Sequence, residues 1–173
     1  MVATALRPVR ITYSARGWGV GELWLAGGVL VGHELPGPAT AEANGGGELA
    51  DRFAAYFAGE PCAFDDVELD LEGSTALQRR LAAELRSVPY GETVTYGELA
   101  ALAGSPNAPR AAGTFCAGNR FPLVVPCHRV VAANGIGGFG SLGVEYKRRL
   151  LQLETAGAGR SASDGCRAFV TDS

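Results

Sequence analysis

The chain of 173 residues has no uninterrupted apolar run of about eighteen residues, the length that a membrane-spanning helix needs. Its N-terminus also lacks a charged start followed by an apolar core and a cleavage site, the pattern of a secretory signal. We therefore expect a cytoplasmic protein with no membrane partner.

Cysteine and histidine are both sparse, and their spacing excludes several kinds of site. The four cysteines show neither close pairing nor C-x-x-C spacing, and the chain holds only two histidines. Zinc clusters and disulfide frameworks both depend on such pairing. We expect no metal, no cofactor and no disulfide framework.

The formal net charge of −3 is unevenly distributed along the chain. Residues 1–73 contain 4 Arg and 11 Asp or Glu, whereas residues 74–154 contain 9 Lys or Arg and 5 Glu. A surface that follows phosphate groups needs a local excess of positive charge, whatever the global balance. The second half of the chain is therefore the candidate for binding a polyanion, although chance clustering on solvated helix faces would give the same count.

The first half has the pattern of a small α/β domain. Alternating apolar residues predict strands over residues 10–13, 21–25 and 29–31, separated by glycine-containing turns. Residues 48–58 place Leu and aromatic side chains at helical spacing. We predict an antiparallel sheet with one helix in a domain over residues 1–73, and a flexible tail over residues 156–173.

The second half, residues 74–155, is predicted to be mainly helical. Thr75 and Thr95 can each cap a helix, and Pro109 is well placed at the start of another. The helices expected over residues 95–102 and 109–116 are joined by a short turn. This pattern indicates a helix-turn-helix in a domain of winged-helix type.

The most informative segment surrounds Cys127. Residues 123–125 are aliphatic and predict a buried strand, and Pro126 marks its end because proline cannot donate to a ladder. His128 and Arg129 follow the thiol directly, and a positive charge nearby would lower the cost of forming a thiolate. The sequence thus predicts a nucleophile, whereas an isolated Cys-His pair would more often be a buried core pair.

A third group is expected to orient the histidine. The apolar positions after Val144 repeat at helical spacing, which places Glu154 on the inward face of a helix. A carboxylate there is costly unless something pairs with it. We predict a relay from Glu154 to His128 and, through a water molecule, to Cys127.

At these residues the chain closely resembles the O6-alkylguanine-DNA alkyltransferases. The match covers most of residues 74–155, and its motifs are Val88-Pro-Tyr-Gly-Glu-Thr93, Thr95-Tyr96-Gly-Glu-Leu-Ala-Ala-Leu102, Arg110-Ala-Ala-Gly113, Asn119, Pro126-Cys-His-Arg-Val130, Lys147, Leu150-Leu151 and Glu154. The resemblance implies a protein that takes an alkyl group from O6 of guanine, with O4-alkylthymine as a second candidate, in double-stranded DNA. It implies one transfer per molecule and no cofactor, and we expect a monomer.

The resemblance also implies a role for each matching residue. Cys127 would be the alkyl acceptor and His128 with Glu154 the relay. Asn119 would brace the turn that carries Cys127, and Tyr96 would contact the flipped base and donate a proton. The remaining implied contacts are to the substrate, by the Cys127 and Val130 carbonyls and Ser141, and to the DNA minor groove, by Arg110, Ala111, Ala112 and Gly113.

Several positions depart from the family pattern. Arg120 replaces the usual proline after Asn119, and the aromatic Phe139 of the glycine-rich loop comes one position early. These changes concern the shape of the pocket more than the chemistry. Two other functions stay open, a recognition protein that flips the damaged base without transfer, and a cysteine hydrolase or redox enzyme that uses Cys127 and His128.

Overall fold

The structure is a computed structural model that describes residues 6–38 and 42–160. The described residues form two compact units, one of residues 6–38, 42–70 and 156–160, and one of residues 71–155. Within the described ranges, no helix has the length and apolar character that crossing a membrane demands.

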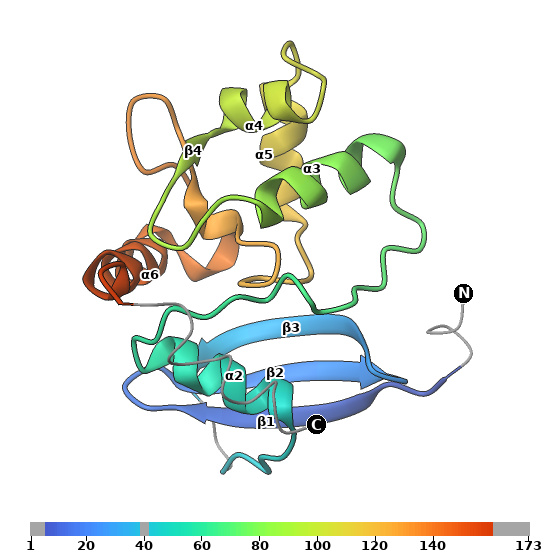
Figure 1. The fold of residues 1–173 in the computed structure, drawn as a ribbon, viewed down its shortest axis with the longest axis vertical. Coiled ribbons are helices and arrows are strands. Elements are labelled where there is room, and N and C mark those ends of the chain that lie inside the picture. The colour runs from blue at the N-terminus through green and yellow to red at the C-terminus, as the bar shows by residue number, and fades with distance from the viewer. Residues whose placement is uncertain (1–5, 39–41, 161–173) are drawn as a thin grey trace. The chain divides into compact units, whose positions relative to one another are not determined.

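The first unit is built on a three-stranded antiparallel sheet in the order β1-β2-β3 (Figure 1). Its strands are β1 (Val9–Ala15), β2 (Gly19–Ala26) and β3 (Val29–Gly37). The later segment around Leu69 joins β3, because Leu30 donates to the Glu68 carbonyl at 2.8 Å and accepts from the Asp70 amide at 2.9 Å. The predicted meander is confirmed, and its strands are longer than the sequence pattern indicated.

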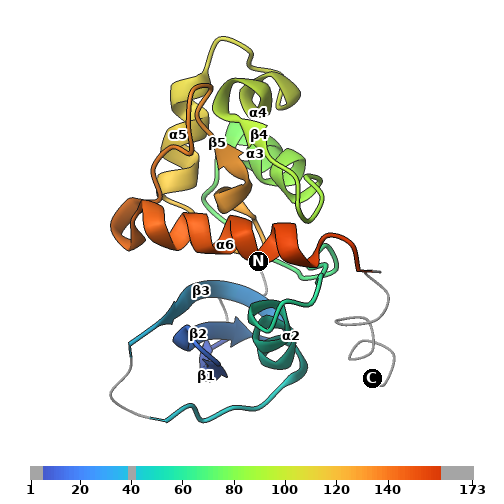
Figure 2. The same ribbon diagram turned by 90° about the vertical axis from the view of Figure 1, so that its left-hand side faces the viewer.

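One helix, α2 (Glu48–Phe57), covers a face of this sheet (Figures 1 and 2). Its buried face carries Phe53, which stacks on His33 of β3 with ring centroids 4.0 Å apart. The Tyr13 hydroxyl lies 2.6 Å from Nε2 of the same histidine. His33 is therefore a satisfied core residue of the first unit.

The second unit contains four α-helices, as its sequence pattern predicts (Figure 2). They are α3 (Ala76–Arg86), α4 (Tyr96–Leu102), α5 (Pro109–Ala117) and α6 (Val144–Gly157). Thr75 and Thr95 both form reciprocal capping boxes, with Gln78 and Glu98 as the partners at the third helical position. Such boxes satisfy two otherwise unpaired amides at the helix start, which is why these two helices begin where predicted.

The helix-turn-helix consists of α4, a turn over residues 103–108, and α5. Pro109 occupies the first turn of α5, where a missing N–H costs nothing. Two short strands, β4 (Val94–Thr95) and β5 (Val130–Val131), pair in parallel beside the start of α4. This pairing connects the helix-turn-helix to the segment that follows Cys127.

The predicted strand over residues 123–125 is wrong. These residues are buried, but they form a turn in which Leu123 has a positive φ of 74°. The Val125 amide donates to the Phe121 carbonyl at 2.8 Å, so the turn satisfies its own backbone groups. A buried aliphatic run is compatible with a strand or a turn, and only the local hydrogen bonds distinguish them.

The sequence predicts no disulfide framework, and one cysteine of the described residues nevertheless forms a disulfide. Cys62 is disulfide-bonded, whereas Cys116 and Cys127 are free. Cys166 and the tail from residue 161 lie outside the described residues.

Candidate active site

Cys127 opens a 3₁₀ turn, Cys127–Arg129, directly after the buried turn that contains Val125. Its side chain is 7% exposed, so the thiol is nearly enclosed. Burial raises the pKa of the Cys127 thiol, while contacts with Asn119 and Lys147 and with local amides act in the opposite direction. The resting thiol is therefore protonated, and a reaction at sulfur needs a group that accepts its proton.

Asn119 braces the turn that presents Cys127. Its Nδ2 donates to the Val125 carbonyl at 2.8 Å, and its Oδ1 accepts from the Phe121 amide at 2.9 Å. The Cys127 amide donates to the same Val125 carbonyl at 2.7 Å. One side chain thus closes the turn at both ends and fixes where the thiol points.

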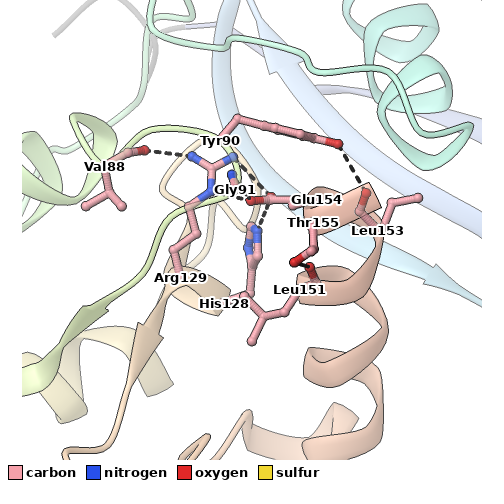
Figure 3. A network of polar contacts seen from close by, with 9 residues as sticks. All are labelled: Val88, Tyr90, Gly91, His128, Arg129, Leu151, Leu153, Glu154 and Thr155. Atoms are coloured by element: carbon pink, nitrogen blue, oxygen red, sulfur yellow. Dashed lines mark hydrogen bonds and ion pairs between the residues drawn. The ribbon is translucent and has the colours of Figure 1, made fainter. Parts of the chain in front are cut away.

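His128 and Glu154 meet inside the unit (Figure 3). The distance from His128 Nε2 to Glu154 Oε2 is 2.5 Å, and each side chain is 1% exposed. α6 brings Glu154 to this place because Lys147, Leu150 and Glu154 lie at helical spacing on its buried face. The two residues that the sequence places on one relay are therefore in direct contact.

The charge states of this pair suit proton transfer from the thiol. Burial lowers the pKa of His128, although Glu154 acts to raise it. His128 and Arg129 hold the pKa of Glu154 far below its usual range in spite of its burial. An ionised carboxylate thus faces a neutral imidazole, and since Nε2 donates to the carboxylate, Nδ1 is the nitrogen that can accept a proton.

Arg129 does not point toward the Cys127 thiol, although it lies only two residues after Cys127 in the sequence. Its guanidinium binds Glu154 through Nε at 2.8 Å and Nη2 at 3.0 Å, and donates to the Val88 carbonyl through Nη1 at 2.8 Å (Figure 3). The expectation that this guanidinium stabilises the thiolate is wrong. Consecutive residues of a tight turn point in different directions, so Arg129 is directed to the carboxylate.

Lys147 is the cation that acts on Cys127, a role that its place among the matching motifs did not reveal. It is fully buried on α6, and its Nζ donates to the Val130 carbonyl at 2.6 Å and to the Gly138 carbonyl at 3.1 Å. Its positive charge works against the burial that raises the pKa of the Cys127 thiol. Its position on the stripe with Leu150 and Glu154 is the signal that could have identified it.

Tyr96 lies beside the same cluster. Lys147 Nζ is 5.8 Å from the centre of its ring, and Gly137 lies so close that an added Cβ would be 3.3 Å from its hydroxyl. Burial raises the pKa of Tyr96, so the hydroxyl keeps its proton. Tyr96 is thus a protonated donor held at the edge of the Cys127 cluster.

The other expected substrate contacts occupy different surroundings. Val130 is fully buried, and its carbonyl already accepts from Lys147. A carbonyl has a second lone pair, so this bond leaves one acceptor position. Ser141 is exposed in the 3₁₀ turn Gly140–Leu142 just before α6.

The expected DNA-binding residues lie on α5. Arg110 is exposed near the start of this helix, and Ala111 and Gly113 are partly exposed. Ala112 is fully buried, so its methyl group faces the interior of the unit and not a DNA groove. Within the described ranges, no group of three or more His, Cys, Asp or Glu side chains could hold a metal ion.

Comparison with known proteins identifies the family. Residues 76–156 match the model of the 6-O-methylguanine DNA methyltransferase, DNA binding domain. The methylated-DNA–protein-cysteine methyltransferase of Methanopyrus kandleri is 45% identical over 125 residues, which are 70% of this chain and 92% of that protein. This chain belongs to the methylated-DNA–protein-cysteine methyltransferase family.

Other family members extend the similarity to solved structures. The Mycobacterium tuberculosis enzyme of the same name is 49% identical over 109 residues, which are 62% of this chain and 64% of that protein. A crystal structure of M. tuberculosis O6-methylguanine methyltransferase superposes with a TM-score of 0.72 at 34% identity, covering 87% of this chain and 94% of the other. Another from M. tuberculosis, solved in complex with DNA, gives 0.72 at 38% identity, covering 85% and 92%.

The effect of the Lys147 charge on the pKa of the Cys127 thiol can be tested by substitution. We expect Lys147→Met to raise the pKa of the Cys127 thiol further, because a buried positive charge is lost at similar side-chain volume. Carboxamidomethylation of Cys127 by iodoacetamide at neutral pH should slow by about tenfold, the effect of one pKa unit on the thiolate fraction. Peptide masses separate Cys127 from Cys116.

Lys147→Arg is the matched control for this prediction, because it retains the charge. Its Cys127 should react at a rate closer to that of the parent chain. If the methionine variant is folded and reacts like the parent, Lys147 only holds the backbone of Val130 and Gly138.

Proposed function

We propose that this chain repairs O6-alkylguanine in double-stranded DNA by moving the alkyl group to Cys127 Sγ, once per molecule. The observation that carries this proposal is the enclosed thiol of Cys127 next to the buried His128–Glu154 pair. Membership of a family whose curated members are named methylated-DNA–protein-cysteine methyltransferases supports the choice of reaction. O4-alkylthymine is the second candidate substrate.

In this reaction a sulfur–carbon bond forms as the bond between O6 and the alkyl carbon breaks. His128 accepts the thiol proton at Nδ1 through a water molecule, and Glu154 stabilises the imidazolium that results. Electrons of the broken bond pass to the guanine ring, which then takes a proton from Tyr96. The thioether on Cys127 is stable, so the protein is consumed with its substrate.

Substrate recognition falls to groups around the thiol. The Cys127 and Val130 carbonyls accept hydrogen bonds from the edge of the extruded guanine, and Ser141 approaches O6. Asn119 keeps the Cys127 turn in place while the base enters.

DNA engagement is assigned to α4 and α5, which form the helix-turn-helix. Arg110 enters the base stack and fills the space left by the extruded guanine, while Ala111 and Gly113 permit close approach to the minor groove. The positive balance of residues 74–154 supports contact with phosphates. We further propose that residues 1–73 and 74–155 are separate domains and that the protein acts as a monomer.

The role of Arg110 can be separated from the chemistry. We expect Arg110→Ala to slow repair of O6-methylguanine in duplex DNA by roughly 10- to 100-fold, since each step of unstacking costs a few kcal/mol that the side chain helps to offset. Transfer from free O6-benzylguanine should change little, because the free base needs no extrusion. The measurement is single-turnover labelling of the protein with each substrate.

Arg110→Lys serves as the charge-retaining control. In a separate experiment on the parent protein, raising the salt concentration should weaken duplex binding steeply while leaving the free-base reaction nearly unchanged. If Arg110→Ala slowed transfer equally from duplex DNA and from free O6-benzylguanine, Arg110 would belong to the pocket and would not fill the space left by the extruded base.

Stoichiometry tests the proposed function as a whole. With excess O6-methylguanine duplex, repaired guanine should reach one equivalent per protein molecule and then stop. Continued turnover would indicate a hydrolase, and binding without any repaired guanine would indicate a recognition protein.

A further inference from the structure

The Glu154 carboxylate receives four hydrogen bonds from three residues, which lie in two segments of the chain (Figure 3). Oε2 accepts from His128 Nε2 at 2.5 Å and from Arg129 Nη2 at 3.0 Å. Oε1 accepts from Arg129 Nε at 2.8 Å and from the Gly91 amide at 3.0 Å. Each carboxylate oxygen therefore accepts two hydrogen bonds. Of the three partner residues, Arg129 is the one that binds both oxygens.

The guanidinium of Arg129 is itself held from other directions. Its Nη1 donates to the Val88 carbonyl at 2.8 Å, and its central carbon lies 5.7 Å from the centre of the Tyr90 ring. The Tyr90 hydroxyl reaches the Leu153 carbonyl of α6 at 3.4 Å. The segment from Val88 to Gly91 therefore joins Arg129 and α6 in one rigid group.

This arrangement fixes the hydrogen-bonding role of His128. A two-point bond between a guanidinium and a carboxylate sets the plane of the carboxylate as well as its position. With that plane fixed, Oε2 presents an acceptor to His128 Nε2, which must carry the hydrogen. The proton acceptor of the imidazole is then Nδ1, on the opposite side of the ring.

The charge of Arg129 also acts on His128. Burial lowers the pKa of His128, Glu154 raises it, and Arg129 and Lys147 lower it again. A buried carboxylate without a counter-charge would favour a permanently protonated imidazole, which could not accept the thiol proton. The guanidinium offsets that effect within hydrogen-bonding distance of the same carboxylate.

We propose that Arg129 is a positioning residue for alkyl transfer, which orients the Glu154 carboxylate so that His128 stays a neutral base with its proton on Nε2. The kinetic part of this inference rests on the proposed function. The part that concerns the state of His128 does not, because it can be measured without any alkylated DNA.

The imidazole state is accessible by ¹⁵N NMR, since the chain contains only His33 and His128. In the parent protein His128 should be the Nε2–H tautomer at neutral pH. Arg129→Met should raise the pKa of His128 by about one unit or more, because a neighbouring buried charge shifts a pKa by 1–3 units. Arg129→Lys should keep the pKa near that of the parent while loosening the tautomer preference, and His33 in the other unit serves as the internal reference.

The transfer step supplies the second readout. The rate of transfer from free O6-benzylguanine would be measured as a function of pH. In Arg129→Met the acidic limb of this profile should move to higher pH by about as much as the pKa of His128 rises, and in Arg129→Lys it should move much less. Leu85→Ala is the matched control, because it removes a fully buried core side chain of α3 without touching any charge. It should lower the melting temperature and leave both the limb and the His128 signals in place.

Two results would overturn the inference. One is a folded Arg129→Met variant in which His128 keeps the pKa and tautomer of the parent. The other is a loss of rate that matches the loss of folded protein, as in Leu85→Ala, with no movement of the acidic limb. If the parent chain transfers no alkyl group at all, the proposed function fails, whereas the NMR comparison still decides what Arg129 does.

Discussion

Replacing Cys127 with serine is expected to abolish alkyl transfer while leaving the affinity for alkylated duplex DNA nearly unchanged. Serine has almost the same shape, but its hydroxyl is neither acidic enough nor nucleophilic enough to replace a thiolate. Binding does not require the sulfur. Transfer of a labelled methyl group and fluorescence anisotropy of a labelled duplex measure the two properties separately.

Cys116→Ser is the matched control for this substitution, because Cys116 is the other cysteine that is free within the described residues. Burial raises the pKa of Cys116 to about 12, so it stays a thiol under ordinary conditions. The Cys116→Ser variant should transfer at close to the parent rate. Label found on Cys116 while Cys127 is unmodified would reverse the assignment.

Glu154→Gln should slow alkyl transfer by roughly 10²- to 10⁴-fold, the range attributed to general acid–base assistance. A glutamine offers one acceptor oxygen in place of two and turns an NH₂ group toward donors. It also leaves Arg129 buried without its partner, and breaking a buried ion pair in this way costs about 3–5 kcal/mol of stability. Single-turnover kinetics and urea unfolding measure the two effects.

The pH dependence of stability has a defined sign in this case. The pKa of Glu154 is lower in the folded protein than in the unfolded chain, so its stabilisation is fully present above the unfolded value of about 4.3. It is lost as the pH falls toward the folded value. Glu154→Gln should remove this part of the acid sensitivity, and Tyr90→Phe, which lacks one hydroxyl contact to α6, should retain it. A folded Gln variant with the parent rate would make Glu154 purely structural.

The parts of the fold that the sequence predicts well are those with local physical causes. Thr75 and Thr95 mark helix starts because their side chains bond to amides three residues later. Glu154 is predictable as a buried carboxylate because its helical phase matches that of Leu150. Its contact with His128 follows, since a buried carboxylate requires a partner.

The parts that the sequence does not predict depend on side-chain direction and long-range contacts. Residues 123–125 form a turn in which Asn119 bonds to the Phe121 amide before them and to the carbonyl of Val125 at their end, and no periodicity reveals these bonds. Arg129 follows Cys127 by two residues, yet its guanidinium binds the Glu154 carboxylate. Lys147 reaches the Val130 carbonyl across 17 positions, so its effect on the thiol becomes visible only in three dimensions.

The most direct test of the account is the mass of the protein after it meets its proposed substrate. The intact chain would be mixed with excess duplex containing one O6-methylguanine and then digested for peptide mapping. We expect a gain of one methyl group per molecule, located on the peptide that contains Cys127, with the guanine restored in the DNA. Restored guanine with an unmodified protein, or a methyl group on any other residue, would contradict it.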